Sequence, residues 1–294
     1  MAVILRCPSD ACLLSAGARP SAGELVVMGC PPLCSAAHHT EGMELPSDDR
    51  APSAGGRSVI RVRRSGPLSG SVRVSGAKNS VLKLMAAAVL APGRFTLHNV
   101  PRIVDVALMA DLLEGMGAKA AHVDDVLTID VPEQMVPEAP YELVERMRAS
   151  IVVLGPLLAR FGEARVSVPG GDDFGHRPID MRLRGLEEMG GSFTTSHGYN
   201  EGRVEQLLGT KVLLEFPSVG ATENLLMAAV IAKGTTVIDN AAREPEIADL
   251  ADFLNAMGAE VQGAGTSTIT VHGVERLCPT EHTVIPVDTI PVEN

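Results

Sequence analysis

The chain has 294 residues, of which 45% are hydrophobic and 3% aromatic, and its formal net charge is −11. This length suits one large domain or two ordinary ones, with an aliphatic core. The acidic balance argues against a nucleic-acid-binding protein, which needs a dense basic face. No stretch approaches the roughly 20 apolar residues of a membrane-spanning helix, so we expect a cytoplasmic protein without a membrane partner.

The first 57 residues have a composition unlike the rest of the chain. Pro, Ser, Gly and Ala dominate residues 1–57 and apolar periodicity is absent, which predicts a disordered tail. Four of the five cysteines lie in this tail, at Cys7, Cys12, Cys30 and Cys34. Their spacing leaves a zinc site open as an alternative, but we interpret them as incidental and expect no metal. Met43 is a candidate for a later translation start.

Two short β patterns follow the tail. SVIRVRRSG, from Ser58, predicts a strand that ends in a turn, and SGSVRVSG, from Ser69, predicts a second short strand. Residues 58–77 are therefore expected to contain strands ahead of the first helix.

The main feature of the remaining chain is an internal repeat. LMAAAVLAPGRFTLHNV, from Leu84, matches LLMAAVIAKGTTVIDNA, from Leu225, and DLLEGMGAK matches DFLNAMGAE. The matching pairs Gly93 and Gly234, Asn99 and Asn240, and Gly117 and Gly258 are each separated by 141 residues. LRGLEEMGGSF, from Leu183, is a weaker copy halfway between them, so the period is roughly 70 residues.

Each repeat predicts the same order of elements. An apolar, Ala-rich helix ends at a glycine, and a β-branched strand follows it. A second helix then ends in Met-Gly, with the glycine as a left-handed cap, and two more strands close the repeat, VLTIDV in the first and STITVHGV in the third. Alternating helices and strands define an α/β fold, with three repeats from Lys78 to near His282 in one pseudo-threefold domain.

Three basic residues stand at the beginning of a helix or in a glycine-rich loop. Lys78 precedes a predicted helix, Arg148 heads the apolar segment MRASIVVLGPLLARFG, and Arg177 closes the loop PGGDDFGHRPID. A lysine at a helix N-terminus can bind an anion, and arginine suits carboxylate and phosphate. Each could equally be a solvated or ion-paired surface residue, and the loop could be a simple turn.

Several long blocks carry a more specific resemblance. They include SGAKNSVLKLMAAAVLA, VSVPGGDDFGHRPIDMRLRGLEEMG and FPSVGATENLLMAAVIAKGTTVIDNAAREPEI. From about Gly66 to Leu277 the chain resembles the UDP-N-acetylglucosamine 1-carboxyvinyltransferase family of enolpyruvyl transferases. The related 5-enolpyruvylshikimate-3-phosphate synthases share the fold but lack these blocks.

The resemblance implies a fold and a reaction. The family has two similar domains of three βαβαββ units, with helices inside and sheets outside, and its substrates bind in the cleft between the domains. The substrates are phosphoenolpyruvate and UDP-N-acetylglucosamine, and the reaction begins peptidoglycan synthesis without a metal or organic cofactor. We accordingly expect residues 78–286 to form one domain and residues 58–77 to belong to the second, incomplete one.

The resemblance also implies roles for individual residues. Lys78 and Asn79 match residues that reach phosphoenolpyruvate and the sugar nucleotide, and Arg148 matches one that steadies the phosphoenolpyruvate or the sugar diphosphate. Two further stretches match contacts to the nucleotide: Arg177, Pro178, Ile179, Asp180 and Met181, and then Phe216, Pro217, Ser218, Val219 and Gly220.

Asp172 departs from the commonest family pattern. It falls where many members have a cysteine that protonates the methylene carbon of phosphoenolpyruvate and reacts with the epoxide fosfomycin, although some members have aspartate. A carboxylic acid can supply this proton if the anionic substrate beside it raises its pKa. We therefore predict Asp172 as the catalytic acid, with Asp173 as the fallback.

A larger departure concerns length. The family is roughly twice as long as the matched part, and its general base and a further phosphoenolpyruvate-binding arginine lie in the other domain. We expect residues 287–294 to be an aberrant tail and turnover by this chain alone to be doubtful. Two alternatives remain open: transfer to a free nucleotide, which His176 beside Arg177 leaves possible, and a non-catalytic nucleotide-binding module. No oligomeric state is predicted.

Overall fold

The computed structural model describes residues 24–27, 70–139, 141–144, 148–167, 179–196 and 198–286. The chain divides into two compact units, Met1–Val74 and Ser75–Asn294. In the first unit, β1 (Glu24–Val27) pairs antiparallel with β2 (Gly70–Arg73). We expected no regular structure in residues 1–57, and β1 corrects this for its four residues. The strand pattern from Ser58 and the four N-terminal cysteines lie outside the described residues.

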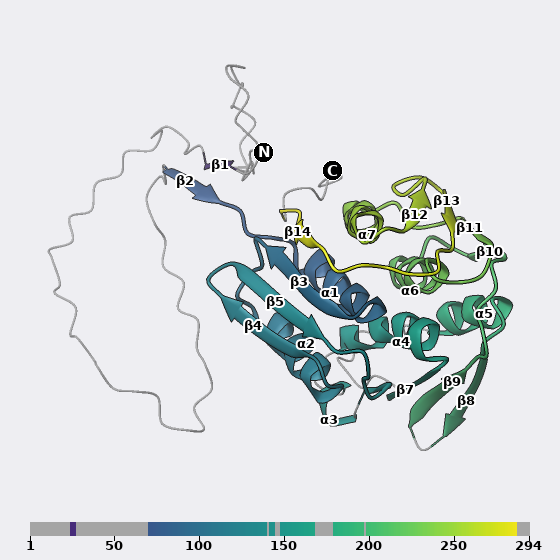
Figure 1. Ribbon diagram of the computed structural model, residues 1–294. Helices are drawn as coiled ribbons and strands as arrows, with labels where there is room; N and C mark the ends of the chain where they lie inside the picture. The colour runs from purple at the N-terminus through teal and green to yellow at the C-terminus, as the bar shows by residue number, and fades with distance from the viewer. Residues whose placement is uncertain are drawn as a thin grey trace, which may run out of the picture. The chain divides into compact units, whose positions relative to one another are not determined.

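The second unit consists of three repeats of one topology (Figure 1). Repeat 1 contains α1 (Lys78–Ala87), a 3-10 turn (Ala88–Leu90), β3 (Gly93–His98), α2 (Val104–Gly115), β4 (Lys119–Val123) and β5 (Val126–Val131). Repeat 2 contains β6 (Glu138–Ala139), α3 (Tyr141–Val144), a 3-10 helix (Arg148–Val153), α4 (Leu154–Phe161), β7 (Glu163–Ser167), α5 (Asp180–Glu188), β8 (Ser192–Ser196) and β9 (Tyr199–Arg203). Repeat 3 contains β10 (Lys211–Leu213), α6 (Val219–Ala229), β11 (Thr235–Asp239), α7 (Pro245–Ala256), β12 (Glu260–Gln262) and β13 (Thr268–His272).

Three four-stranded sheets, one for each repeat, lie on the outside of the unit, and the helices lie between them (Figure 1). The strands alternate buried and exposed side chains, as expected for a sheet with one covered face. Leu127, Ile129 and Val131 of β5, for example, all face the core. The helices in the middle are apolar almost all round, and most residues of α1 and α6 are buried. The predicted α/β fold, with helices inside and sheets outside, is confirmed.

The predicted Met-Gly helix ends are also confirmed. Gly117, Gly190 and Gly258 have φ of 110°, 101° and 101°, a left-handed conformation that glycine adopts without steric cost. The preceding methionines, Met116, Met189 and Met257, are buried in the core. Each second helix therefore ends the same way, with its last side chain anchored inside.

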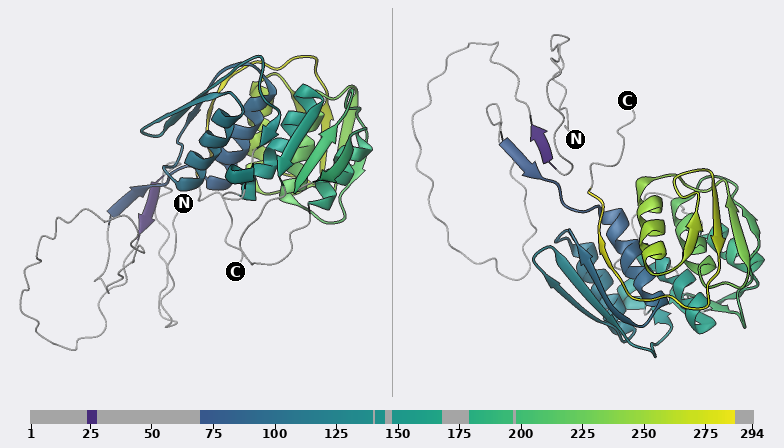
Figure 2. Two further views of the ribbon diagram at one scale, coloured as in Figure 1. Left: turned by 90° about the horizontal axis from the view of Figure 1, so that it is seen from below. Right: turned by 45° about the horizontal axis from the view of Figure 1, so that its top comes forward.

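The last described strand, which the sequence patterns did not predict, belongs to the sheet of repeat 1. β14 (Glu281–Thr283) pairs in parallel with β3, so it completes the sheet of repeat 1 (Figure 2). β6 and β10 provide the same parallel edge strand for the other two sheets. The three repeats are thus closed into a ring. A strand of two or three residues carries too little periodicity to reveal its sheet from sequence.

A buried carboxylate fixes β14 to the helices. Asp249 of α7 is 4% exposed and accepts hydrogen bonds from the Ser80 hydroxyl of α1 and from His282 Nε2 of β14, the latter at 2.8 Å. The His282 ring also meets Phe253 edge to face, with centroids 5.5 Å apart. Asp249 therefore joins the first and third repeats to the strand that closes the ring.

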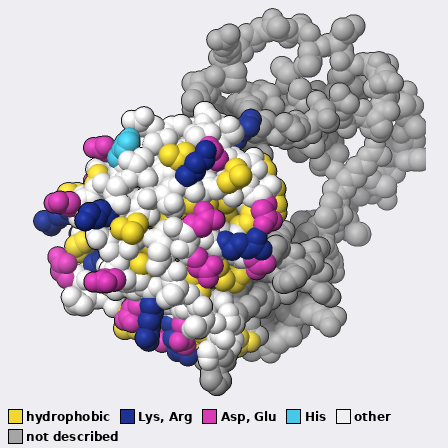
Figure 3. Space-filling view, turned by 90° about the vertical axis from the view of Figure 1, so that its right-hand side faces the viewer, with side chains coloured by type: hydrophobic (Ala, Val, Ile, Leu, Met, Phe, Trp, Pro, Cys, Tyr) yellow, Lys and Arg dark blue, Asp and Glu magenta, His cyan; other side chains and the backbone are white. Residues whose placement is uncertain are grey.

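Among the described residues, no helix is long and apolar enough to cross a membrane. On the face shown in Figure 3, acidic and basic side chains are interspersed with isolated apolar ones. Such a mixture is typical of a solvated surface, in contrast to the single-sign stripe of a nucleic-acid-binding face.

Candidate functional site

The entry into α1 is held by backbone contacts from two distant segments. The Gly76 N–H donates to Asn99 O at 3.0 Å, and the Ala77 N–H donates to Ile285 O at 2.7 Å. A Cβ on Gly76 would lie only 2.1 Å from Asn99 O, so this close approach requires glycine. α1 begins at the next residue, Lys78, and no side chain caps it. The first N–H groups of α1 are therefore available to an anion.

Lys78 already has a partner in this structure. Its Nζ lies 2.5 Å from Oδ2 of Asp105, in the first turn of α2. The two side chains are 54% and 31% exposed, so water screens this ion pair. Sequence reasoning missed Asp105, although an acidic residue in the first turn of a helix was a visible signal. An anion that binds Lys78 has to compete with Asp105 or share the lysine with it.

Asn79 is exposed beside Lys78, and its backbone oxygen accepts a hydrogen bond from Lys83 Nζ at 3.1 Å. Because Asn79 is exposed, its side chain can face a ligand while its backbone is held from within the same helix.

The segment before α6 forms the second part of the site. Phe216 is half-exposed, and Ser218 caps α6 by accepting from the Ala221 N–H at 3.4 Å. Pro217, Val219 and Gly220 lie with them at this helix start. A Cβ on Gly220 would lie 1.8 Å from Nη2 of Arg182, so the Arg182 guanidinium occupies that space. Arg182 Nε also donates to Gly220 O at 2.9 Å.

The third part is the start of α5. Ile179 is the cap residue, Asp180 is exposed at the first position, and Met181 is buried. Arg182, the next residue, reaches across to Gly220. The structure therefore brings two of the predicted stretches together, at the beginnings of α5 and α6.

Four predicted residues are placed only in part or not at all. Arg148 begins the 3-10 helix that precedes α4, which agrees with its expected place at the head of an apolar segment, but its side chain is not described. Asp172, Arg177 and Pro178 lie outside the described residues, as do His176 and residues 287–294. Their roles remain predictions.

A buried carboxylate lies beneath these helix starts and was missed from the sequence. Glu223 of α6 is 1% exposed, and its Oε1 lies 3.0 Å from Lys83 Nζ of α1. Burial raises the pKa of Glu223 to about 7, although Lys83 and Arg182 oppose the shift and Glu246 adds to it. Burial also lowers the pKa of the Arg182 guanidinium. A charged residue inside the apolar run ATENLLMAAV was the available signal.

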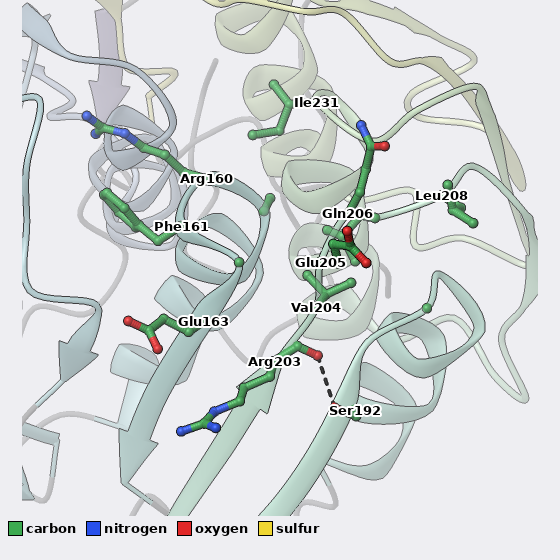
Figure 4. Close-up of a pocket in the computed structure, with 14 residues that line it drawn as sticks. Arg160, Phe161, Glu163, Ser192, Arg203, Val204, Glu205, Gln206, Leu208 and Ile231 are labelled. Carbon is green, nitrogen blue, oxygen red and sulfur yellow. Dashed lines mark hydrogen bonds between the residues drawn. The ribbon is translucent and has the colours of Figure 1, made fainter.

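A groove lies elsewhere on the described part of the chain. A groove of about 1300 Å³ follows the end of α4 and the connection from β9 to β10, and its residues include Glu163, Arg203 and Glu205 (Figure 4). None of its lining residues belongs to the predicted site. It adjoins the C-terminal ends of α4 and α5, where the helix dipole repels anions, whereas the predicted residues lie at N-terminal ends.

Among the residues that the structure describes, no group of three or more His, Cys, Asp or Glu side chains could hold a metal ion. Cys278 is free and exposed. Charged groups at these helix starts or within the next turn or two include Lys78, Asp105, Lys83, Asp180, Arg182 and Glu223. Such an arrangement can bind and orient an anionic ligand without a metal.

Comparison with solved structures defines the class of fold. The enolpyruvyl transferase NikO from Streptomyces tendae matches with a TM-score of 0.66 and 27% identity, over 74% of this chain and 52% of NikO. EPSP synthase from Acinetobacter baumannii matches with a TM-score of 0.58 at 20% identity, which supports the fold alone. The three-repeat unit therefore has the enolpyruvyl transferase fold.

Sequence comparison gives the family. The family model described as EPSP synthase (3-phosphoshikimate 1-carboxyvinyltransferase) matches residues 62–290, and the chain belongs to this family. Within it, the chain is 52% identical to UDP-N-acetylglucosamine 1-carboxyvinyltransferase 1 of Caldanaerobacter subterraneus, over 76% of this chain and 54% of that protein. It is 54% identical to the UDP-N-acetylglucosamine 1-carboxyvinyltransferase of Corynebacterium jeikeium, over 74% of this chain and 52% of that protein. The chain thus spans about half the length of the curated relatives it matches.

Proposed function

We propose that this chain provides one domain of a UDP-N-acetylglucosamine 1-carboxyvinyltransferase, which transfers enolpyruvyl from phosphoenolpyruvate to the 3-hydroxyl of UDP-N-acetylglucosamine. Identity above 50% to the two relatives named above supports this acceptor. The observation that carries the proposal is that three predicted contact segments, from three different repeats, are linked at the starts of α1, α5 and α6. We place the reaction in the cytoplasm, at the start of peptidoglycan synthesis.

The proposed chemistry is addition followed by elimination. The sugar 3-hydroxyl gives its proton to the family's general base and adds to C2 of phosphoenolpyruvate, while Asp172 gives a proton to C3, which forms a tetrahedral phospholactoyl intermediate. Loss of phosphate from C2 and of a proton from C3 then yields the enolpyruvyl ether. Lys78, Arg148 and Arg177 would stabilise the carboxylate and phosphate charges, and their effect is largest where water is excluded.

We further propose that this chain alone binds the nucleotide weakly and does not turn over. The resemblance assigns the general base to the part of the family that this chain does not span, and a missing general base costs roughly 10²–10⁴-fold in rate. Loss of the second wall of the cleft also removes the positioning of the two substrates.

Two measurements on the purified 294-residue chain test these proposals. Titration with UDP-N-acetylglucosamine, followed by protein NMR, is expected to shift resonances at the starts of α1, α5 and α6. A phosphate-release assay with both substrates is expected to show no turnover. Shifts produced equally by UMP would favour a free-nucleotide acceptor, and robust phosphate release would show that one domain suffices.

A further inference from the structure

Lys83 connects the buried Glu223 carboxylate to the first turn of α1. Its Nζ lies 3.0 Å from Glu223 Oε1 and donates to Asn79 O at 3.1 Å, and its side chain is 13% exposed. A lysine shared between a buried carboxylate and a helix carbonyl is held in one position, because leaving it would leave both groups without a partner. The backbone of Asn79 is therefore tied to α6.

Arg182 connects α6 to the beginning of α5. Its Nε donates to Gly220 O, and its guanidinium fills the space beside Gly220 where any other residue would carry a Cβ. Glu223 lies one turn further along α6, and its charge favours the charged form of this buried guanidinium. Arg182 directly follows Asp180 and Met181, so the start of α5 is tied to the start of α6.

Asn224 adds a link to α4. Its side chain accepts from the Gly155 N–H at 3.0 Å and donates to Gly220 O at 3.1 Å. A Cβ on Gly155 would lie 2.4 Å from Asn224 O, so α4 and α6 touch through their backbones. Gly220 O thus receives two donors, one from Arg182 and one from Asn224.

We infer that Glu223, together with Lys83 and Arg182, is a positioning cluster that sets the places of the Lys78–Asn79, Asp180–Met181 and Ser218–Gly220 segments relative to one another. These segments come from three different repeats. Asn79 O accepts from Lys83 and Gly220 O accepts from Arg182, while Asp180 and Met181 directly precede Arg182 in α5. The substrate-binding role of these segments rests on the proposed function. Their mechanical coupling does not depend on it.

The charged groups around Glu223 explain what stabilises the positioning cluster. Lys83 faces it from α1, Arg182 from α5 and Glu246 from α7, while α4 approaches Asn224 through the Gly155 N–H. Two buried carboxylates thus face two partly buried cations, and removal of one leaves an uncompensated charge. A change at Glu223 therefore has to affect α1 and α5 as well as α6.

Hydrogen exchange of the whole chain, measured by mass spectrometry, tests the coupling. Glu223→Gln is expected to raise exchange in α1, α5 and α6 together, by roughly 10- to 100-fold, because a buried charge loses its partner. Asp249→Asn is a matched control, since Asp249 is also a buried carboxylate but, among the described residues, its side chain hydrogen-bonds to α1 and β14 and not to α5. It is expected to raise exchange in α1 and β14 and to leave α5 unchanged. Faster exchange in α6 alone for Glu223→Gln would overturn the inference.

A double variant separates positioning from stability. Lys83→Met with Glu223→Met replaces the ion pair by apolar side chains, which often keeps or increases stability. We expect wild-type melting, but raised exchange in α5 and at least roughly tenfold weaker binding of UDP-N-acetylglucosamine. Wild-type exchange in α5 would mean that the cluster only fills space. If the wild-type chain bound no nucleotide while the coupling persisted, the proposed function would fail and the positioning cluster would stand.

Discussion

Asn99 and Asn240, 141 residues apart, have the same unusual backbone conformation and make the same hydrogen bond. Their φ angles are 59° and 57°, in the left-handed region. Asn99 Nδ2 donates to Val284 O and Asn240 Nδ2 to Leu214 O, each at 3.0 Å. Both acceptor carbonyls directly follow a parallel edge strand, β14 or β10. The same asparagine hydrogen bond thus holds the edge strand in repeats 1 and 3, although in repeat 1 that strand comes from the far end of the domain.

This asparagine hydrogen bond predicts different effects for two substitutions. Asn240→Ala is expected to lower the free energy of unfolding by about 2 kcal/mol, because it loses a hydrogen bond and because alanine adopts the left-handed region less readily than asparagine. Asn240→Gly loses only the hydrogen bond and is expected to cost about 1 kcal/mol. Urea denaturation measures the unfolding free energy of both variants and shows whether Asn240→Ala loses more than Asn240→Gly. Equal losses would mean that the backbone conformation carries no cost there.

Lys78 offers a second prediction that separates binding from stability. Lys78→Ala removes a half-exposed ion pair and is expected to change the melting temperature little. Binding of UDP-N-acetylglucosamine or phosphoenolpyruvate is expected to weaken by roughly tenfold, since a charged contact to the ligand is lost.

Arg94→Ala is the matched control for Lys78→Ala. Arg94 makes a similar exposed ion pair with Asp130, at 2.7 Å, between strands β3 and β5. Arg94→Ala is expected to leave both the melting temperature and ligand binding unchanged. Calorimetric titration measures the ligand affinity of the two variants. Equal affinities of Lys78→Ala and Arg94→Ala would mean that Lys78 does not belong to the proposed site.

Glu223 predicts a pH dependence of stability. Its pKa is about 7 in the folded chain, above the ordinary value of 4.5 for a glutamate, so the folded state binds the proton more tightly. The stabilisation from this group is therefore full below pH 4.5 and is lost as the pH rises through 7. Relative to Glu223→Gln, which does not titrate, the wild type is expected to lose on the order of 3 kcal/mol between pH 4.5 and pH 7.5.

Urea denaturation at several pH values measures that difference. The difference between the unfolding free energies of wild type and Glu223→Gln should fall steadily across this interval and level off above it. A difference that stays constant with pH would show that Glu223 is already ionised in the folded state at acidic pH, held by Lys83.

The sequence predicted the parts of this fold that repeat and missed the parts that pair at long range. The helices that end at Gly117, Gly190 and Gly258 follow from local periodicity and from glycine chemistry. The place of β14 does not, because its partner β3 lies far earlier in the chain and three residues carry no pattern. The same limit hid Glu223, whose partners Lys83 and Arg182 meet it only after three repeats have folded together.

The resemblance carried most of the predicted site, and the structure adds how its parts are held. Lys78, Asn79 and the stretches at Asp180 and Ser218 were named by matching blocks. Their mutual contacts through Lys83 and Arg182 were not, because an ion pair between helices depends on tertiary packing that local sequence does not encode.

The last prediction concerns Asp172 as the catalytic acid. The test uses this chain joined to the part of a UDP-N-acetylglucosamine 1-carboxyvinyltransferase that the chain does not span. The joined protein is expected to be active and to resist fosfomycin, because a carboxylate is a far weaker nucleophile toward an epoxide than a thiolate. Asp172→Cys is expected to keep activity and to gain time-dependent inactivation, which a pre-incubation assay measures.

Asp172→Asn tests the acid itself. An amide keeps the shape of the carboxyl group but cannot deliver a proton to the methylene carbon, so turnover is expected to fall by roughly 10²–10⁴-fold. Asp173→Asn in the same protein is the control, because the neighbouring carboxylate matches no catalytic residue of the family and its loss should leave turnover near wild type. Near-full activity of Asp172→Asn together with an inactive Asp173→Asn would transfer the role of the acid to Asp173, since the loop would then present that carboxyl group to the substrate.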